Sequence, residues 1–190
     1  MDLRAYLLDA LGDLRGKLMG GIVEHVPPVR WPEQADGGGS SIAWLLLHLA
    51  RHQDLAVQTV IRNQPPLFLA ERDGMGLGSI PTWAGLTESE DPAVSSAPSP
   101  DALINYVVGV FAGTKRWMSR LSAMAMESVP DAPRRLEQHA LLPREDVPWL
   151  YANWTGKSVN WFVQGPVLGH GHGHIGEAVS VRNRMGLSPF

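Results

Sequence analysis

Three histidines at alternate positions near the end of the sequence are the residues best suited to chemistry. His170, His172 and His174 are separated by single glycines. In a strand all three side chains would lie on one face, whereas in a helix His170 and His174 would share a face and His172 would point away. Pro166 suits the first position of a helix and Gly186 suits its end, so the flanking residues favour the helix. A leading turn over residues 158–164, before Pro166, is an alternative start.

A His-x-x-x-His pair on one helix face is a two-point site for a divalent metal ion. Neutral imidazoles one turn apart can direct their nitrogens at a single ion. The alternative is a polar, glycine-loosened helix surface that binds no ion. Gly171, Gly173 and Gly176 each cost about 1 kcal/mol relative to alanine in a helix interior. We interpret them as a sign that another backbone or a ligand approaches the helix closely there.

A further histidine, His48, lies inside an apolar segment in the first half of the chain. Ser40 or Ser41 can cap a helix over residues 42 to about 62, which is apolar around most of its girth near His48. Such a helix is expected at the centre of the fold. A lone histidine there is more often a hydrogen-bonded core residue than a ligand. The presence of the His170–His174 pair elsewhere in the chain favours a ligand role for His48.

His52 lies one turn beyond His48 and forms another His-x-x-x-His pair with it. A site with four histidines is therefore one alternative. The residues around His52, at positions 51, 53 and 54, are polar, and for that reason we expect His52 at the rim of the site. Trp44, one turn before His48, is expected beside the site as well.

The composition limits the classes of function. With 190 residues, 44% of them apolar and 18% charged, the chain suits one domain over residues 1–190 with a sizeable core. A formal net charge of −3 without a basic run argues against nucleic-acid binding. No cysteine is present, so a metal ion must be held by His, Asp, Glu, water or a substrate atom. No apolar run reaches the length of a membrane span and no signal peptide is recognisable, so we expect a cytoplasmic protein.

Two further helices complete the predicted core. Leucines recur at three- and four-residue steps over residues 2 to about 25, where Asp2 can cap the helix. A third helix should begin at Pro100, with Ser99 as its cap, and run to about residue 129. The segments 63–98 and 130–157 have no sustained period and are rich in proline, so we expect long connections there. The sequence thus predicts an all-α four-helix bundle, a fold that builds metal sites from side chains on facing helices.

The order of two motifs resembles a known family. Trp44-Leu-Leu-Leu-His48 in the second helix is followed by His170-Gly-His-Gly-His174-Ile-Gly-Glu177 in the last, which resembles the DinB-like superfamily of four-helix bundles. That superfamily includes bacterial thiol-dependent transferases and mycothiol-dependent maleylpyruvate isomerases. In it, one histidine of the second helix and two of the fourth hold a divalent metal ion, with water in the remaining positions. The resemblance therefore implies metal ligands at His48, His170 and His174. The last motif carries more glycines than is usual in the family.

Three neutral imidazoles leave open coordination positions on Zn²⁺, Ni²⁺ or Fe²⁺, which is typical of catalytic rather than structural sites. Because such an ion lowers the pKa of a bound water or thiol, the first hypothesis is a transferase or isomerase that activates a small thiol for a small-molecule substrate. One alternative is a non-catalytic metal- or ligand-binding bundle in a stress response. Another is a metallohydrolase with Glu177 as general base, although Glu177 can instead hydrogen-bond a ligand imidazole. An enzyme needs a pocket beside the ion, and we expect segment 63–98, with Arg72 and Asp73, to supply its lid.

Self-association is also expected from the sequence. The chain has a low charge content, seven tryptophans and proline-rich connections. We expect these features to leave apolar surface that a monomer does not fully bury. We expect a homodimer formed by the first and third helices, because the second and fourth carry the metal site. The alternative is a monomer in which the long connections fold back over that surface.

Overall fold

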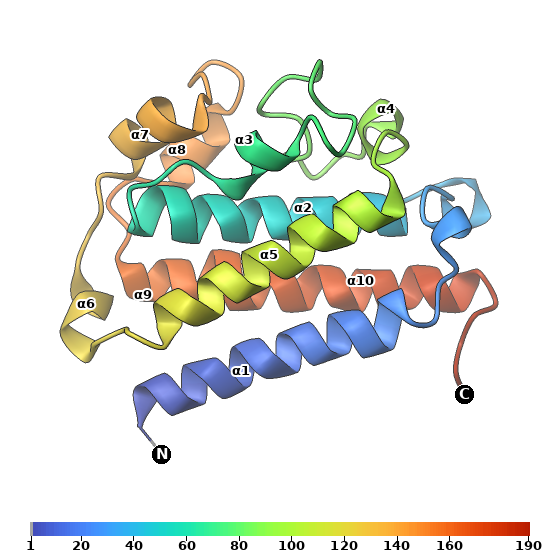
Figure 1. The fold of residues 1–190 in the computed structure, drawn as a ribbon, viewed down its shortest axis with the longest axis horizontal. Coiled ribbons are helices and arrows are strands. Elements are labelled where there is room, and N and C mark those ends of the chain that lie inside the picture. The colour runs from blue at the N-terminus through green and yellow to red at the C-terminus, as the bar shows by residue number, and fades with distance from the viewer. Residues whose placement is uncertain (1) are drawn as a thin grey trace.

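The computed structural model describes residues 2–190, and all of the regular structure in that range is helical. Four long helices form a bundle, as predicted (Figure 1). Three of the four contain wider π-helical turns, labelled η here. The four are α1 (Leu3–Leu18) with η1 (Met19–Val23), α2 (Ile42–Asp54) with η4 (Leu55–Ile61), α5 (Pro100–Met118), and the last helix, α9 (Val159–Phe162), η6 (Val163–Gly169) and α10 (His170–Arg184).

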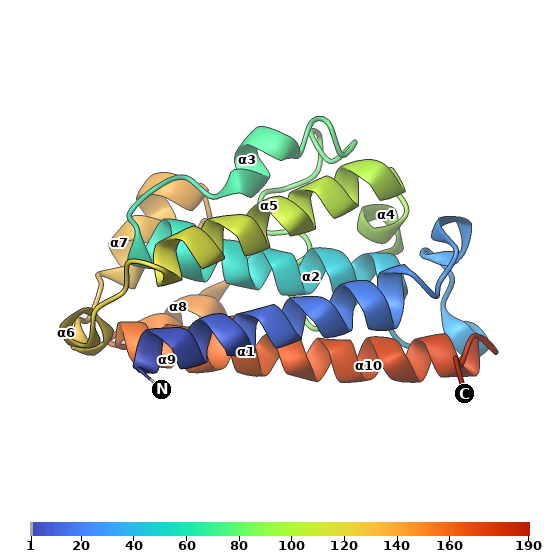
Figure 2. The same cartoon turned by 60° about the horizontal axis from the view of Figure 1, so that its bottom comes forward.

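The four long helices close into a ring. α2 packs against α5 and α10, and α1 packs against the same two helices from the other side. α1 and α10 run in one direction while α2 and α5 run in the other (Figures 1 and 2). Because α2 and α5 run the same way, the chain between them must return along the whole bundle. That geometry accounts for the long connection predicted after α2.

The helices begin where the sequence places capping residues. The side chain of Asp2 accepts a hydrogen bond from the Ala5 N–H at 2.8 Å at the start of α1. Ser41 does the same for the Trp44 N–H at 3.2 Å, and Ser99 for the Ala102 N–H at 3.2 Å. Each bond satisfies a backbone donor that the first turn leaves unpaired.

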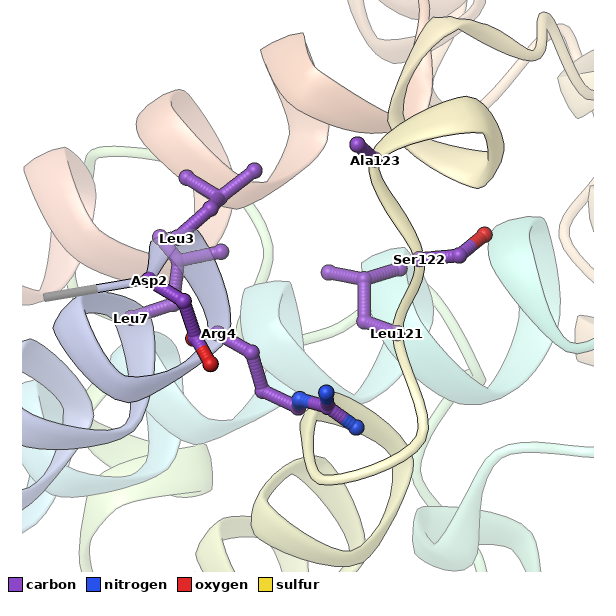
Figure 3. A pocket seen from close by; sticks show the side chains of 7 residues that line it. All are labelled: Asp2, Leu3, Arg4, Leu7, Leu121, Ser122 and Ala123. Carbon is purple, nitrogen blue, oxygen red and sulfur yellow. The ribbon is translucent and has the colours of Figure 1, made fainter.

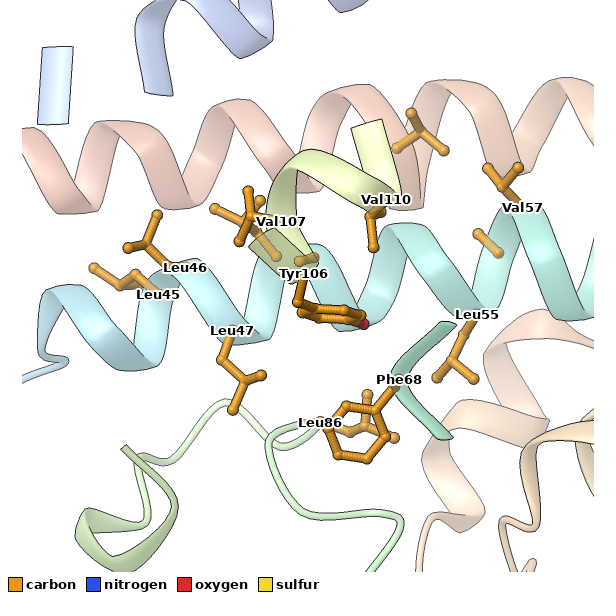
Figure 4. Packing of buried hydrophobic residues seen from close by; sticks show 14 of the residues in the cluster. Leu45, Leu46, Leu47, Leu55, Val57, Phe68, Leu86, Tyr106, Val107 and Val110 are labelled. Atoms are coloured by element: carbon orange, nitrogen blue, oxygen red, sulfur yellow. The ribbon is translucent and has the colours of Figure 1, made fainter. Parts of the chain in front are cut away.

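The helix α2 is the centre of the core, as expected from its apolar girth. Every residue from Ile42 to Asp54 is buried. Figure 4 shows Leu45, Leu46 and Leu47 of α2 beside Tyr106 and Val107 of α5. The helix α2 therefore contacts protein on all sides, and a polar side chain on it needs a partner inside the protein.

A close approach between helices explains one of the glycines of α10. A Cβ atom on Gly171 would lie 2.9 Å from Cδ2 of Leu14, which α1 directs at this point of α10. The expectation of a close contact is thus confirmed for Gly171. At Gly173 and Gly176 a Cβ atom would meet nothing within 4 Å, so no neighbour accounts for those two glycines.

The turn considered before Pro166 is part of the last helix, whereas the predicted end of the third helix was wrong. The last helix begins at Val159, where Ser158 caps it by accepting from the Trp161 N–H at 3.3 Å, and Pro166 lies inside the helix rather than at its start. The wider turn of η6 leaves room for a ring that has no N–H to donate. The third helix ends at Met118, not near residue 129, because Ser122 caps a separate short helix, α6 (Ala123–Glu127).

The connections carry short helices that the sequence did not predict. Those in the α2–α5 and α6–α9 connections cover α2 on the side away from α1, and those in the α1–α2 connection lie at one end of the bundle (Figure 1). Among residues 2–190, no helix has both the length and the apolar character needed to cross a membrane. The short helices are η2 (Pro28–Arg30), η3 (Ala35–Gly37), α3 (Leu67–Glu71), α4 (Pro92–Ser95), α7 (Ala132–Arg135) with η5 (Leu136–Ala140), and α8 (Pro148–Trp154).

Candidate metal centre

Four side chains from three parts of the chain converge between α2 and α10. His48, Glu88, His170 and His174 each offer one potential ligand atom, and these atoms all lie within 4.8 Å of one another. α2 supplies the first histidine, α10 supplies the other two, and the connection after α3 supplies the carboxylate. The three histidines singled out from the sequence are therefore neighbours, whereas Glu88 was not predicted. His172 is exposed on the opposite side of α10.

His48 is oriented by a backbone carbonyl. Its side chain is fully buried, and Nδ1 lies 2.9 Å from the carbonyl oxygen of Gly85. Because a carbonyl only accepts, Nδ1 carries the proton and Nε2 keeps its lone pair. That Nε2 is buried and has no hydrogen-bond partner within residues 2–190. A buried acceptor left unpaired costs about 1–3 kcal/mol, so this atom is suited to a ligand from outside the chain.

The two histidines of α10 face each other. Nε2 of His170 lies 3.2 Å from Nε2 of His174. Two imidazole nitrogens bound at about 2.0–2.1 Å to one tetrahedral ion would lie about 3.3 Å apart. The observed separation therefore matches that of two ligands on the same cation.

Glu177 contacts the ring nitrogen of His174 that faces away from His170. Its Oε2 accepts a hydrogen bond from Nδ1 of His174 at 3.1 Å, which leaves Nε2 of His174 with its lone pair. A carboxylate behind a ligand imidazole fixes the ring and increases its basicity. Glu88 lies on the other side, with carboxylate oxygens 3.8 Å from Nε2 of His48 and 3.9 Å from Nε2 of His174.

His52 and Trp44 pack directly against the cluster. Trp44 stacks on His48 with ring centroids 5.6 Å apart, and His52 stacks on His170 with centroids 4.2 Å apart. Nε2 of His52 donates to the carbonyl oxygen of Leu86 at 3.2 Å. His52 is only 4% exposed, and its polar neighbours at positions 51, 53 and 54 are buried as well. Polar neighbours were therefore a misleading sign of exposure.

Those buried polar neighbours hold the connection that completes the site. The carboxylate of Asp54 accepts from the first two backbone N–H groups of α3, at 3.1 and 2.9 Å, and from the Tyr106 hydroxyl at 3.0 Å. Arg51 lies over the ring of Phe68 and donates to the carbonyl oxygen of Thr82 at 2.6 Å. The chain that follows presents the two carbonyls that orient His48 and His52, and then Glu88.

Burial favours the neutral form of three imidazoles in this region, those of His48, His52 and His170. It lowers the pKa of His48, with a smaller contribution from the nearby His174, and lowers the pKa of His52 well below its ordinary value. Burial and the neighbouring histidines lower the pKa of His170 to about 3. Neutral imidazoles are the form that binds a metal ion. The donor set of three nitrogens and a carboxylate, without thiolate, suits Zn²⁺, Ni²⁺ or Fe²⁺.

A pocket of about 470 Å³ adjoins the cluster. His52, Glu88 and His170 form one end of it, and most of its wall comes from α8 and from the last helix. Its volume lies in the range of small-molecule sites. The remaining lining residues are Trp149, Ala152, Asn153, Trp154, Lys157, Trp161, Gly165, Pro166 and Gly169.

The expected lid from segment 63–98 is not found as predicted. Arg72 binds the carbonyl oxygens of Leu77, Gly78 and Ile80 within its own loop, and Asp73 lies beside Gly78. That segment contributes only Glu88 to the pocket lining. A different hollow of about 240 Å³ lies between the start of α1 and the α5–α6 connection, and none of the clustered histidines lines it (Figure 3).

Comparisons with known proteins agree with this fold. A solved structure from Enterococcus faecalis, described as a conserved protein, has a TM-score of 0.67 to this chain at 16% identity, with 97% of each chain covered. At that identity the likeness shows the fold alone. No curated protein matches the chain. A family model of the DinB superfamily matches residues 7–153, which include His48 and Glu88 but not α10. Since this match covers most of the sequence, the chain belongs to the DinB superfamily.

Proposed function

We propose that this protein holds a divalent metal ion through His48, His170 and His174, with Glu88 beside them. The observation that carries the proposal is the buried Nε2 of His48, which has no partner among the described residues and lies in a group of ligand atoms within 4.8 Å of one another. The 3.2 Å spacing of the α10 imidazoles supports the same conclusion. Glu177, His52 and Trp44 then hold the ligand rings in place.

We further propose that the site is catalytic, as a metal- and thiol-dependent transferase or isomerase. When bound, the cation supplies a Lewis acid that lowers the pKa of a small thiol or a water molecule. The chain has no cysteine of its own, so the thiol would be a cosubstrate such as mycothiol. The side chains that line the pocket would bind and orient the second substrate, and the tryptophans among them would exclude water.

The alternatives receive less support. A non-catalytic binding bundle needs no second-substrate pocket, whereas a pocket of about 470 Å³ reaches His170 and Glu88. A metallohydrolase with Glu177 as general base is disfavoured because Glu177 bonds Nδ1 of His174, the ring nitrogen that faces away from His170. The homodimer and the cytoplasmic location remain predictions.

Elemental analysis of the purified protein tests the metal site, and a screen of small thiols with electrophilic substrates tests the chemistry. We expect about one Zn, Ni or Fe per chain in the wild-type protein and a loss of it in His48→Ala. His172→Ala is the matched control, because His172 lies between two proposed ligands but is exposed. Equal metal content in all three proteins would exclude the site. Metal without thiol-dependent turnover would favour the non-catalytic alternative.

A further inference from the structure

The pocket beside the metal centre has flat aromatic walls. Trp149 stacks on His52 with an angle of 23° between the rings, Trp154 packs edge-on against Phe162, and Trp161 stands at the far end. Trp149 and Trp161 are partly exposed, while Trp154 is buried. Indole faces of this kind bind flat apolar groups through large contact areas.

The floor of the pocket is a stretch of the last helix with little side-chain bulk, lined by two glycines and Pro166. Gly165 and Gly169 lie one turn apart on the last helix, between Trp161 and His170, and both line the pocket. A Cβ atom on Gly165 would meet only the ring of Trp161, at 3.9 Å, so the space above this glycine is open. From Trp161 to Gly169 the helix rises about 12 Å, at 1.5 Å per residue. A flat ligand can therefore lie along this floor with one end at the histidines.

A single lysine stands at the end of the pocket away from the histidines. Lys157 lies near the ring of Trp161, with its Nζ 5.4 Å from the ring centroid. Among residues 2–190, no carboxylate lies within ion-pair distance of it. The carboxylate in the pocket lining, Glu88, lies instead against the imidazoles of His48 and His174. A cation held on an aromatic face without a counter-ion is suited to bind an anionic group of a ligand.

We propose that the pocket selects a substrate with a flat, apolar ring system that bears a carboxylate. The carboxylate binds Lys157, the ring lies on the Gly165–Gly169 floor between the tryptophans, and the opposite end reaches the metal centre. This inference rests on the proposed function, since it names the substrate class of the same site. Lys157 and Gly165 are then specificity-determining residues.

Calorimetric titration with two probes tests the proposal on the protein as purified. The probes are 2-naphthoate and its neutral counterpart 2-naphthamide, which share a flat ring system and differ in charge. We expect Lys157→Gln to weaken naphthoate binding by about tenfold, the loss of one charge-assisted contact, and to leave naphthamide binding unchanged. Gly165→Leu fills the floor and should abolish the binding of both probes. Gly176→Leu, at an open position elsewhere on the same helix, should change neither.

The metal content of each sample separates this inference from the proposed function. If the wild-type protein holds metal and binds neither probe, the substrate class is wrong and the metal site stands. If it binds naphthoate in the expected pattern without metal, the pocket assignment stands and the proposed function fails. Unchanged naphthoate affinity in Lys157→Gln would overturn the role of the lysine. Unchanged affinity in Gly165→Leu would overturn the location, and circular dichroism establishes that the variants are folded.

Discussion

Replacing Gly171 and Gly173 by alanine, one at a time, should change the stability in opposite directions. Both residues lie inside α10. Alanine stabilises a helix interior by about 0.8–1.0 kcal/mol relative to glycine. At Gly173 an added Cβ atom meets nothing within 4 Å, so the full gain is expected there. At Gly171 the added atom would lie 2.9 Å from Cδ2 of Leu14, a side chain with no exposed surface.

The magnitude follows from two opposing contributions. Overpacking a filled core costs about 1–3 kcal/mol, which exceeds the helix gain at Gly171. Gly171→Ala should therefore be destabilised by about 0–2 kcal/mol, and the two variants should differ by about 1–3 kcal/mol. For a chain of this size, 1 kcal/mol corresponds to a shift of about 2–4 °C in Tm.

Thermal unfolding followed by circular dichroism measures this difference. Metal-free samples are needed, because a cation bound to the folded state would add its own stabilisation. Gly176→Ala is a second control and should resemble Gly173→Ala, since its position is also open. If Gly171→Ala proves as stable as Gly173→Ala, the described contact between Leu14 of α1 and α10 is wrong.

Three further predictions concern the site, the pH dependence and the assembly. His48→Ala should lose its metal yet lower Tm less than Leu49→Ala, because the bundle forms the site before the ion binds. Leu49→Ala should reduce the free energy of unfolding by about 2–5 kcal/mol. Calorimetry showing that the metal-free wild-type protein is unfolded would refute this prediction. Acid should destabilise the metal-free protein. Burial holds the pKa of His170 at about 3 in the folded protein, whereas in the unfolded chain this histidine takes up a proton near pH 6.5. Urea unfolding at pH 5 should therefore show that this residue lowers the free energy of unfolding by about 2 kcal/mol. The raised pKa of Asp54, about 6, opposes this loss by about 1 kcal/mol, and a protein more stable at pH 5 than at pH 7 would contradict the assignment. Light scattering at micromolar concentration should give a dimer, and a constant mass near 20.7 kDa on dilution would exclude it.

Local signals in the sequence predicted the fold well. Leucine periodicity and the caps at Asp2, Ser41 and Ser99 placed the starts of three long helices correctly. The start of the last helix was ambiguous because Pro166 is a favourable first residue, and the sequence does not reveal that a π-helical turn accommodates it inside a helix that begins at Val159. Backbone irregularities of this kind depend on packing around the residue, which local patterns do not report.

The site was only partly visible in the sequence. The spacing of the histidines identified the pair on α10, since residues four apart share a helix face. The sequence did not identify Glu88 as a candidate ligand, because its position is fixed by Arg51 and Asp54. These two buried polar residues bind the connection that precedes Glu88. Buried charges anchoring a loop look like exposed ones in a sequence. The same ambiguity explains why His52 was expected at the rim rather than against His170.

X-ray absorption spectroscopy of the metal-loaded protein identifies the groups that coordinate the cation. We expect three imidazole nitrogens in the coordination shell, at about 2.0–2.1 Å for zinc. His48→Ala, reloaded with excess metal, should show one imidazole fewer, and His172→Ala should show the wild-type shell. A shell without imidazole, or one that keeps the same number of imidazoles in His48→Ala, would contradict a metal centre built by α2 and α10.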